Sequence, residues 1–331
     1  MLSRLDHPNI IKILGAGKVP RRFIVLEYLE ETVTNVLTKR TKQSGFSLFR
    51  KPVFTYSEIL EKSAQLASAL HYIHDLVHTG ATILHRDLKP DNVGLGADGS
   101  LKLFDFGLST CVNRRTSPLE SYKMTGNTGS LRYMAPEVVL SKPYNEKVLT
   151  HSYSLLLSLT HSYSLAYSYS LLLLHSLTHS LTHSYSLTLT HSYSLLLTHS
   201  YSLTLTYSLT YLLTLTLKVD VYSFGIILWQ LASEATPFKG FSRDDFLCKV
   251  VAGDERPKID KSWPNGFTSI IVSCWHKDPL QRPPFATIVE RLQSLIDELN
   301  RSRFQRGKSI FKNVESPELS EKKSEKKSGW F

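Results

Sequence analysis

Two stretches of sequence decide the fold: residues 85–92 read His-Arg-Asp-Leu-Lys-Pro-Asp-Asn, and residues 105–107 read Asp-Phe-Gly. Asp87 can accept the proton of a hydroxyl group, and Lys89 can reach a transferred phosphate. Asn92 and Asp105 offer the hard oxygen ligands that Mg²⁺ prefers. Transfer of a phosphoryl group needs mainly a positioned nucleophile and neutralised phosphate charge. Each residue alone is typical of a surface loop, but the two blocks together indicate phosphoryl transfer.

Three further motifs carry a family resemblance. Residues 129–137 read Gly-Ser-Leu-Arg-Tyr-Met-Ala-Pro-Glu, residues 220–225 read Asp-Val-Tyr-Ser-Phe-Gly, and residues 274–283 read Cys-Trp-His-Lys-Asp-Pro-Leu-Gln-Arg-Pro. With the first two blocks, they resemble eukaryotic protein kinases, and most closely the tyrosine-kinase-like group of Ser/Thr kinases. The resemblance covers about residues 2–148 and 218–297. It implies an α+β protein-kinase-like fold, with a mainly helical C-lobe and a remnant of the β-rich N-lobe.

The resemblance also implies the activity and the residues that carry it. The expected reaction moves the γ-phosphoryl group of ATP to Ser or Thr of a protein substrate, with Mg²⁺ as the metal. Asp87 would be the base and Lys89 the stabiliser of phosphate charge, while Asn92 and Asp105 would bind the metal and the nucleotide. Lys89 favours Ser/Thr over Tyr specificity. Ser130 matches the family position that contacts Asp87 and Lys89.

Four more residues are expected to support this site. Asp220 resembles the helix aspartate that holds the catalytic-loop backbone, and Glu137 and Arg282 resemble the ion pair that ties the activation segment to the late helices. Arg86 can pair with a phosphate, which suggests control by activation-loop phosphorylation. The expected phosphorylation sites are Thr125 and Thr128.

Residues 1–29 are expected to be a remnant of the kinase N-lobe. Strands are predicted near residues 10–14 and at residues 23–26, leading into a hinge where the Glu27 C=O and the Leu29 N–H would bind adenine. The sequence shows no glycine-rich phosphate loop, no ATP-binding strand lysine and no helix glutamate, which kinases use to hold the phosphates. The chain is therefore expected to be inactive as given. The alternative function is a non-catalytic binding or scaffold module with the kinase fold.

An insertion of low complexity interrupts the kinase pattern at residues 149–217. It contains only Leu, Thr, Ser, His and Tyr apart from Ala166. A tandem ACTC tetranucleotide encodes Thr, His, Ser and Leu, so the segment resembles translated simple-sequence DNA. Removing residues 149–219 restores the family pattern, because Val148 then precedes Asp220. Its apolar runs are too short for a membrane span, and its histidines lack the carboxylate or thiolate partners of a metal site.

The C-lobe is expected to be mainly helical, and one helix is predicted over residues 57–79. Its apolar residues recur at three- to four-residue spacing, and Ser57 can cap it. His71, His74 and His78 lie on this helix and are interpreted as residues of its face rather than metal ligands. His85 is interpreted as a core residue that packs under Phe106.

Composition points to an intracellular protein. Three cysteines, Cys111, Cys248 and Cys274, lack Cys-x-x-Cys spacing, so neither a disulfide framework nor a zinc site is indicated, and a reducing cytoplasmic compartment fits. The net charge is +10, but residues 301–331 supply half of it, with nine Lys/Arg against four Glu. Such a run indicates a solvated tail rather than a nucleic-acid interface. The polar N-terminus shows no signal peptide.

The expected organisation has five parts, and the oligomeric state is left open. The parts are an N-lobe remnant with hinge (1–29), a first C-lobe part with the catalytic and activation loops (30–148), the repeat insertion (149–217), a second C-lobe part (218–299) and a basic disordered tail (300–331). The interrupted pattern also allows a mis-assembled gene in which the insertion is not part of the native protein.

Overall fold

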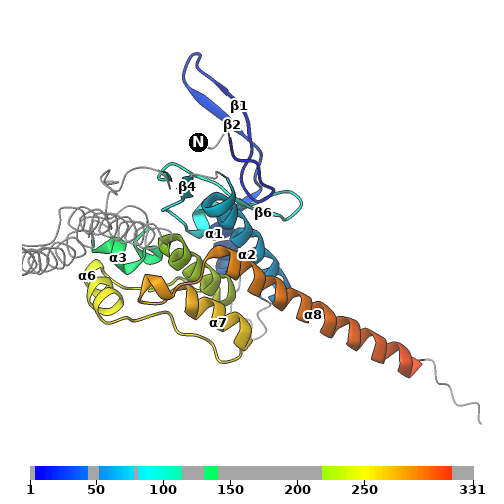
Figure 1. The fold of residues 1–331 in the computed structure, drawn as a ribbon. Helices are drawn as coiled ribbons and strands as arrows, with labels where there is room; N and C mark the ends of the chain where they lie inside the picture. Colours follow the sequence, from blue (N-terminus) through cyan, green and yellow to red (C-terminus); the bar gives the residue numbers. More distant parts are fainter. Residues whose placement is uncertain (1–3, 44–51, 78–80, 114–129, 141–217, 315–331) are drawn as a thin grey trace, which may run out of the picture.

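The computed structural model describes residues 4–43, 52–77, 81–113, 130–140 and 218–314 of the chain. Thr125, Thr128 and the repeat segment 149–217 lie outside the described residues. The described residues form an α+β fold in which small sheets lie beside a larger helical body (Figure 1). The fold class predicted from the sequence is thus confirmed.

The strands form three small sheets. They are β1 (Ile13–Gly17), β2 (Phe23–Leu26), β3 (Glu31–Thr32), β4 (Ala81–Leu84), β5 (Val93–Leu95), β6 (Leu101–Leu103) and β7 (Thr110–Asn113). The sheets are β1–β2, β3–β5–β6 and β4–β7, with antiparallel pairing throughout. Ahead of β1, Ile10 forms a parallel bridge with Leu103. The β1–β2 hairpin is therefore joined to β6 at its base.

The helices build the body that carries the catalytic loop. They are α1 (Val33–Gln43), α2 (Tyr56–His71), α3 (Pro136–Val139), an α-helix at residues 218–233, α6 (Arg243–Asp245), α7 (Asn265–Cys274) and α8 (Phe285–Val314). A π-helical turn, Tyr72–Leu76, extends α2, and a second π-helical segment, Phe246–Ala252, follows α6. Figure 1 shows α2, α7 and α8 together in this body, with the end of α8 extending beyond it.

Helix α2 begins one residue before the predicted start, and its cap is Thr55 rather than Ser57. The Thr55 hydroxyl accepts a hydrogen bond from the Glu58 N–H, and the Glu58 carboxylate accepts one from the Thr55 N–H. This reciprocal capping box satisfies two amide donors that the first turn leaves open. The Ser57 hydroxyl instead donates to Glu61. The expectation for Ser57 was wrong because Glu58 lies at the capping-box spacing from Thr55.

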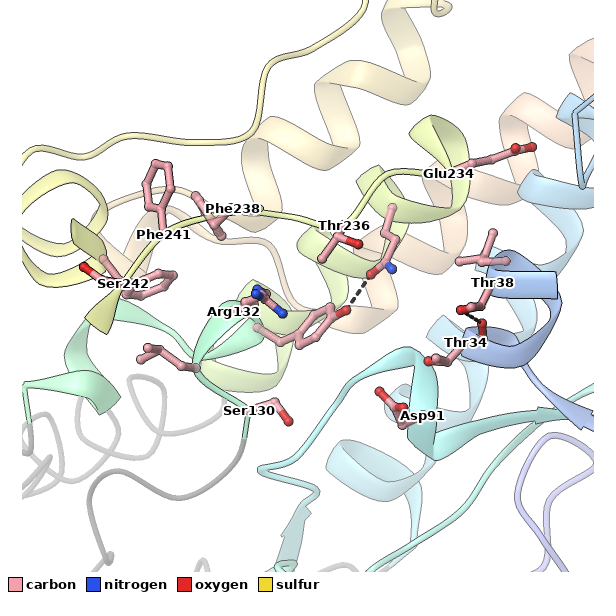
Figure 2. Close-up of a pocket in the computed structure, with 15 residues that line it drawn as sticks. Thr34, Thr38, Asp91, Ser130, Arg132, Glu234, Thr236, Phe238, Phe241 and Ser242 are labelled. Atoms are coloured by element: carbon pink, nitrogen blue, oxygen red, sulfur yellow. Dashed lines mark hydrogen bonds between the residues drawn. The ribbon is translucent and has the colours of Figure 1, made fainter. Parts of the chain in front are cut away.

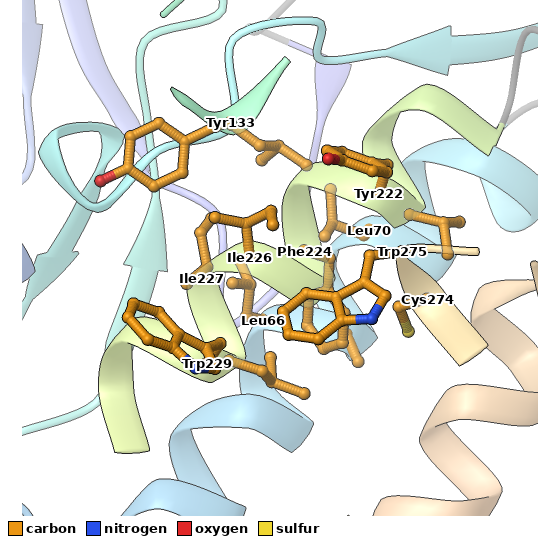
Figure 3. Close-up of a cluster of buried hydrophobic side chains, with 14 of the residues drawn as sticks. Leu66, Leu70, Tyr133, Tyr222, Phe224, Ile226, Ile227, Trp229, Cys274 and Trp275 are labelled. Carbon is orange, nitrogen blue, oxygen red and sulfur yellow. The ribbon is translucent and has the colours of Figure 1, made fainter. Parts of the chain in front are cut away.

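The core lies where α2, the 218–233 helix and the end of α7 meet (Figure 3). The 218–233 helix is buried nearly all round, which marks a central helix. Gly225 permits this packing, because a Cβ there would lie 2.8 Å from the Cβ of Cys274. The side chains shown in Figure 3 include Leu66, Leu70, Tyr133, Tyr222, Phe224, Ile226, Ile227, Trp229, Cys274 and Trp275.

The β1–β2 hairpin, by contrast, carries its apolar side chains on the surface. All four residues of β2 are exposed, and Val19 and Tyr28 are 84% and 81% exposed. Figure 1 shows the hairpin projecting away from the helical body. A two-stranded hairpin is marginal in water on its own. Strands were predicted at both places, near residues 10–14 and at 23–26, and the second matches β2.

The expectation of a disordered tail from residue 300 was wrong for its first part. Helix α8 continues to Val314. Residues 301–305 are helical but exposed, and Arg301 Nε donates to the Asp297 carbonyl one turn earlier. Local helix propensity and such contacts extend the helix beyond the region that packing alone would order.

Candidate active site

The catalytic loop lies between β4 and the short 3₁₀ turn Pro90–Asn92. Asp87 is buried at 8% exposure, and Lys89 Nζ donates to its Oδ2 at 2.7 Å. Asn92 Nδ2 donates to the Asp87 carbonyl at 2.8 Å and to its Oδ2 at 3.1 Å. The Ser130 N–H donates to Asp87 Oδ1 at 3.2 Å. The carboxylate is thus held in one orientation while it keeps acceptor capacity for a hydroxyl proton.

Ser130 contacts Asp87 through its backbone. The sequence predicted contact with both Asp87 and Lys89 at this position, and the recorded hydrogen bond runs from the Ser130 amide to Asp87 alone. Through this bond, the segment that starts at residue 130 is fixed against the catalytic loop. The hydroxyl of Ser130 lines an adjoining cavity instead.

Asp220, on the 218–233 helix, fixes the backbone of the loop. Its Oδ2 accepts from the His85 N–H and its Oδ1 from the Arg86 N–H, both at 2.9 Å. These bonds hold Arg86 at φ 69°, in the left-handed region that non-glycine residues rarely adopt. A side chain far along the chain therefore supplies the constraint that a strained loop residue needs.

The sequence did not identify His74 as a partner of Asp220. His74 Nε2 lies 2.8 Å from Asp220 Oδ2, and both side chains are almost wholly buried. Burial raises the pKa of Asp220, but the hydrogen bond with His74, the charges of His74 and His85 and the Arg86 amide outweigh it and lower the pKa overall. The sequence interpretation placed His74 on a helix face rather than in a metal site but gave it no partner; the structure places it on a buried face, bonded to Asp220. Its spacing to His71 and His78 gave no signal, because its partner lies 146 residues away.

His85 packs as the sequence predicted. Its ring centroid lies 5.0 Å from that of Phe106, and Nε2 lies 3.1 Å from the Phe104 carbonyl. Complete burial lowers the pKa of His85, which favours the neutral ring. His85 therefore supports the segment that leads into Asp105 rather than offering a base to a substrate.

Asn92 lies directly before β5, and Asp105 lies two residues after the end of β6. Val93 pairs with Leu103, and the Phe104 N–H donates to the Asn92 carbonyl at 3.0 Å. Asp105 follows directly, at φ 59°, and its Oδ1 accepts from the Gly107 N–H. A side-chain amide oxygen and a carboxylate are ligand types that fit Mg²⁺, which takes few protein ligands and completes its shell with water and phosphate oxygens. Within the described ranges, no cluster of three or more His, Cys, Asp or Glu suggests another metal.

Arg282 and Glu137 form a two-point ion pair. Arg282 Nη1 lies 2.7 Å from Glu137 Oε1, and Nη2 lies 3.1 Å from Oε2. The guanidinium is buried and also donates to the Lys218 carbonyl at 3.0 Å. Lys218 Nζ in turn donates a hydrogen bond to the Arg282 carbonyl. Burial is the main cause that lowers the pKa of Lys218, and the positive charge of Arg282 lowers it further. The pair thus joins α3, the first turn of the 218–233 helix and the loop before α8.

This arrangement corrects one boundary inferred from the sequence. Removal of residues 149–219 would delete Lys218 and Val219, which are buried in the first turn of the 218–233 helix. The Val219 carbonyl also accepts from the Ser223 hydroxyl. A deletion that preserves this turn therefore ends at residue 217.

The expected hinge residues contact strands β5 and β6. The Glu27 N–H donates to the Lys12 carbonyl at 2.9 Å, and the Glu27 carboxylate accepts from Lys102 at 3.2 Å. Leu29 covers Gly94, where a Cβ would lie 2.5 Å from Leu29 Cδ1. Within the described parts of the chain, neither the Glu27 C=O nor the Leu29 N–H makes a recorded hydrogen bond. Both groups are thus available to a planar ligand.

Arg86 reaches the start of the segment expected to be phosphorylated. Its Nη1 donates to the Thr110 hydroxyl at 2.9 Å, on β7. The candidate sites Thr125 and Thr128 lie outside the described residues, so their relation to Arg86 stays a prediction.

A cavity of about 500 Å³ opens beside the catalytic loop (Figure 2). Six parts of the chain line it: α1, the Pro90–Asn92 turn, residues 130–133, the end of the 218–233 helix, the segment into α6 and the start of the π-helical segment at Phe246. Tyr133 donates from its hydroxyl to Gln230 Oε1 at 2.6 Å within this lining. Sequence reasoning missed this cavity because no single motif spans the segments that form it.

Comparison with known proteins agrees with this geometry. A family model described as "Protein kinase domain" matches residues 1–171, and a second, "Protein tyrosine and serine/threonine kinase", matches residues 208–292. The serine/threonine/tyrosine-protein kinase HT1 of Arabidopsis thaliana is 26% identical over 294 residues, which cover 88% of this chain and 52% of that protein. Human mitogen-activated protein kinase kinase kinase 7 is 26% identical over 298 residues, covering 89% of this chain and 34% of that protein.

These matches, with the loop and ion-pair geometry above, define a protein kinase domain. The chain belongs to the protein kinase family, and its relatives include Ser/Thr kinases. The chain spans about half or less of the length of the curated relatives described above. Among the residues that the structure describes, no helix has both the length and the apolar character to cross a membrane.

Proposed function

We propose that this chain is a protein serine/threonine kinase of the tyrosine-kinase-like group, which transfers the γ-phosphoryl group of ATP to a Ser or Thr hydroxyl. The observation that carries the proposal is the orientation of Asp87 by Asn92, Lys89 and Ser130, on a loop fixed by Asp220. A carboxylate held this way can orient a hydroxyl group and take its proton.

Other residues of the site would stabilise phosphate charge, bind the metal and bind adenine. Lys89 would meet negative charge on the transferred group, Asn92 and Asp105 would hold Mg²⁺, and the Glu27 C=O and Leu29 N–H would hold adenine. When bound, Mg-ATP supplies the phosphoryl group and the metal charge that neutralises it. Arg86 would couple the loop to a phosphate on Thr125 or Thr128.

We further propose that residues 1–331 expressed alone transfer phosphate only slowly. The sequence includes no glycine-rich loop and no strand lysine to hold the phosphates, so only the catalytic half of the site is provided. The domain division expected above is part of the proposal, with the second C-lobe part beginning at Lys218 and the tail starting beyond Val314.

A fusion protein tests the proposal. A small lobe from a related kinase is joined ahead of Leu2, and residues 149–217 are deleted. The fusion should phosphorylate a generic protein substrate in a Mg²⁺-dependent way, and Asp87→Asn should reduce the rate by about a thousandfold or more. Asp98→Asn, at an exposed turn, is the matched control and should keep the activity. A folded fusion that is inactive, or one that Asp87→Asn leaves unchanged, contradicts the proposal.

The rival function, a non-catalytic binding module, is favoured by one observation. The hairpin exposes contiguous apolar side chains, among them Phe23 and Ile24 at 51% and 62% exposure, and such surfaces often bind other chains. The fusion discriminates the two, because a scaffold would bind partners without needing Asp87. The free cysteines Cys111, Cys248 and Cys274 support a reducing, cytoplasmic location for either function.

A further inference from the structure

Helix α8 leaves the helical body toward its C-terminal end. Near its start, Phe285, Ile288 and Leu292 are almost completely buried. Further along the helix, Leu299 is half-buried and Phe304 is 63% exposed. Figure 1 shows the end of the helix projecting beyond the body. The last turns of α8 therefore lie where a binding partner can reach them.

The charge of α8 changes where the helix leaves the body. Residues 285–298 contain three acidic residues and one arginine, whereas residues 299–314 contain five basic residues and no acidic one. The five basic residues are Arg301, Arg303, Arg306, Lys308 and Lys312. A helical segment of this composition is attracted to an anionic partner and repelled by a basic one.

Apolar residues of the same segment recur at helical spacing. Successive residues of an α-helix are about 100° apart around its axis, so four apolar positions fall within one arc of about 120°. These positions are Phe304, Ile310, Phe311 and Val314. Three of the basic positions follow one edge of this arc, and Arg306 lies near the other edge. Basic residues that flank an apolar arc are typical of helices that lie in the interface of a membrane.

Arg303 is the basic residue whose position falls within the apolar arc, and it contacts the body. Its Nη1 donates to the Ser57 hydroxyl at 3.3 Å, in the first turn of α2. This bond ties α8 to the body one residue before Phe304. Residues 304–314 then span about 16 Å at a rise of about 1.5 Å per residue. A partner groove that encloses a helix would meet the body at this end, whereas a flat surface needs to contact one face alone.

We propose that the C-terminal part of α8, residues 299–314, binds the surface of an anionic membrane. The apolar arc enters the boundary between headgroups and acyl chains, and the flanking Lys and Arg residues pair with anionic groups of the lipids. The helix lies on the membrane and does not cross it. This inference goes beyond the proposed function, because it holds whether or not the chain transfers phosphate.

Binding of the full 1–331 chain to lipid vesicles tests the inference. The vesicles contain phosphatidylcholine alone or an equimolar mixture of phosphatidylcholine and phosphatidylserine, and co-sedimentation measures the bound fraction. The apparent affinity should be at least about tenfold higher for the anionic vesicles, and it should fall as NaCl is added, because salt screens the attraction. Equal binding to the two kinds of vesicle, or binding that salt leaves unchanged, overturns the inference.

Two variants separate the charge of the segment from its apolar arc. Arg306→Gln combined with Lys308→Gln should weaken binding to the anionic vesicles by about twentyfold, since each cation near such a surface contributes about fivefold. Phe311→Ala should weaken it by about fivefold to tenfold, because less apolar area enters the membrane. Lys258→Gln combined with Lys261→Gln is the matched control. It removes the same charge from an exposed loop of the body and should change binding by less than about twofold.

A soluble competitor distinguishes a membrane from a protein partner. Polyglutamate should compete with the anionic vesicles only weakly, because it offers negative charge without an apolar phase. If polyglutamate binds as tightly as the vesicles and with the same dependence on Phe311, the partner is an acidic protein and the inference fails. Helix variants that bind vesicles like the unmodified chain also overturn it. Unchanged thermal unfolding of the variants shows that weaker binding does not come from loss of the fold.

Discussion

The catalytic loop and the β1–β2 hairpin belong to the same kinase domain, yet they are stabilised in opposite ways. The loop around Asp87 is buried, and hydrogen bonds from Asp220, Asn92 and Ser130 fix it. The hairpin exposes every residue of β2 and is joined to the body mainly through the Ile10–Leu103 bridge at its base. The loop around Asp87 is therefore stabilised by its contacts with the helical core, whereas the β1–β2 hairpin has little such support.

The largest effect is expected where the loop meets the core, at Asp220. Asp220→Ala removes the two carboxylate oxygens that accept from the His85 and Arg86 amides, and it leaves His74 buried without its Asp220 partner. Breaking a buried pair of this kind costs about 3–5 kcal/mol. Urea unfolding should show a loss in this range, whereas Asp297→Ala, on the surface of α8, should change stability by less than about 0.5 kcal/mol. A small loss of unfolding free energy in Asp220→Ala would mean that the loop keeps its conformation without the Asp220 side chain.

The next effect is expected at the ion pair that ties α3 to the late helices. Arg282→Met should lower the unfolding free energy by about 2–3 kcal/mol, since Glu137 loses a two-point partner but keeps some access to water. Lys249→Met is the control, because its pair with Asp245 is exposed to solvent and should contribute little to stability. Equal losses in the two variants would contradict the structural role of Arg282.

Acidification should weaken the core that carries the loop. Burial lowers the pKa of His85 and of His7, so below the ordinary histidine pKa of 6.5 the unfolded chain takes up protons that the folded chain does not. Stability is therefore full above about pH 6.5 and falls as the pH drops, by at most about 1.4 kcal/mol per pH unit for each proton. The lowered pKa of Asp220 adds a loss in the same direction below about pH 3.8.

Urea unfolding at a series of pH values measures this dependence. His85→Asn should reduce the slope between pH 6.5 and 5, whatever its effect on absolute stability. A slope that is unchanged in this variant, or stability that rises on acidification, would contradict the assignment of a neutral buried ring.

The smallest effect is expected in the hairpin. Ile24→Thr changes an exposed strand residue to another β-branched one and should alter the unfolding free energy by less than about 0.5 kcal/mol. The same substitution at Ile226, which is fully buried, should cost about 2 kcal/mol or more, because it places a hydroxyl in the core. Comparable losses at the two sites would show that the hairpin packs against something in solution.

The sequence motifs named residues of the candidate site, but they did not predict which side chains surround those residues. Asp87, Asp220, Glu137 and Arg282 were named through the family resemblance; the structure places Asp220 against the loop backbone and Glu137 against Arg282, and the catalytic role of Asp87 stays a prediction. The buried contact of His74 was not predicted, because the residue that explains it lies on a helix 146 residues later. Tertiary proximity of this kind leaves no periodic trace in a single sequence.

The end of α8 and the cavity were also beyond the sequence. The continuation of α8 to Val314 depends on local hydrogen bonds such as that of Arg301 with Asp297, whereas the Thr55 capping box has a spacing, Thr-x-x-Glu, that the sequence does show. The cavity beside Asp91 forms only where six segments of the chain meet, so it depends on tertiary packing.

Amide hydrogen exchange tests the central claim most directly, because it reads the stability of the two regions in one experiment. The account predicts that the amides of His85 and Arg86, bonded to the buried Asp220, exchange only through global unfolding of the helical body. The β2 amides should exchange orders of magnitude faster, through local opening of the hairpin. Equal protection of the two regions, or rapid exchange at His85 and Arg86, would contradict a catalytic loop built on the helical core.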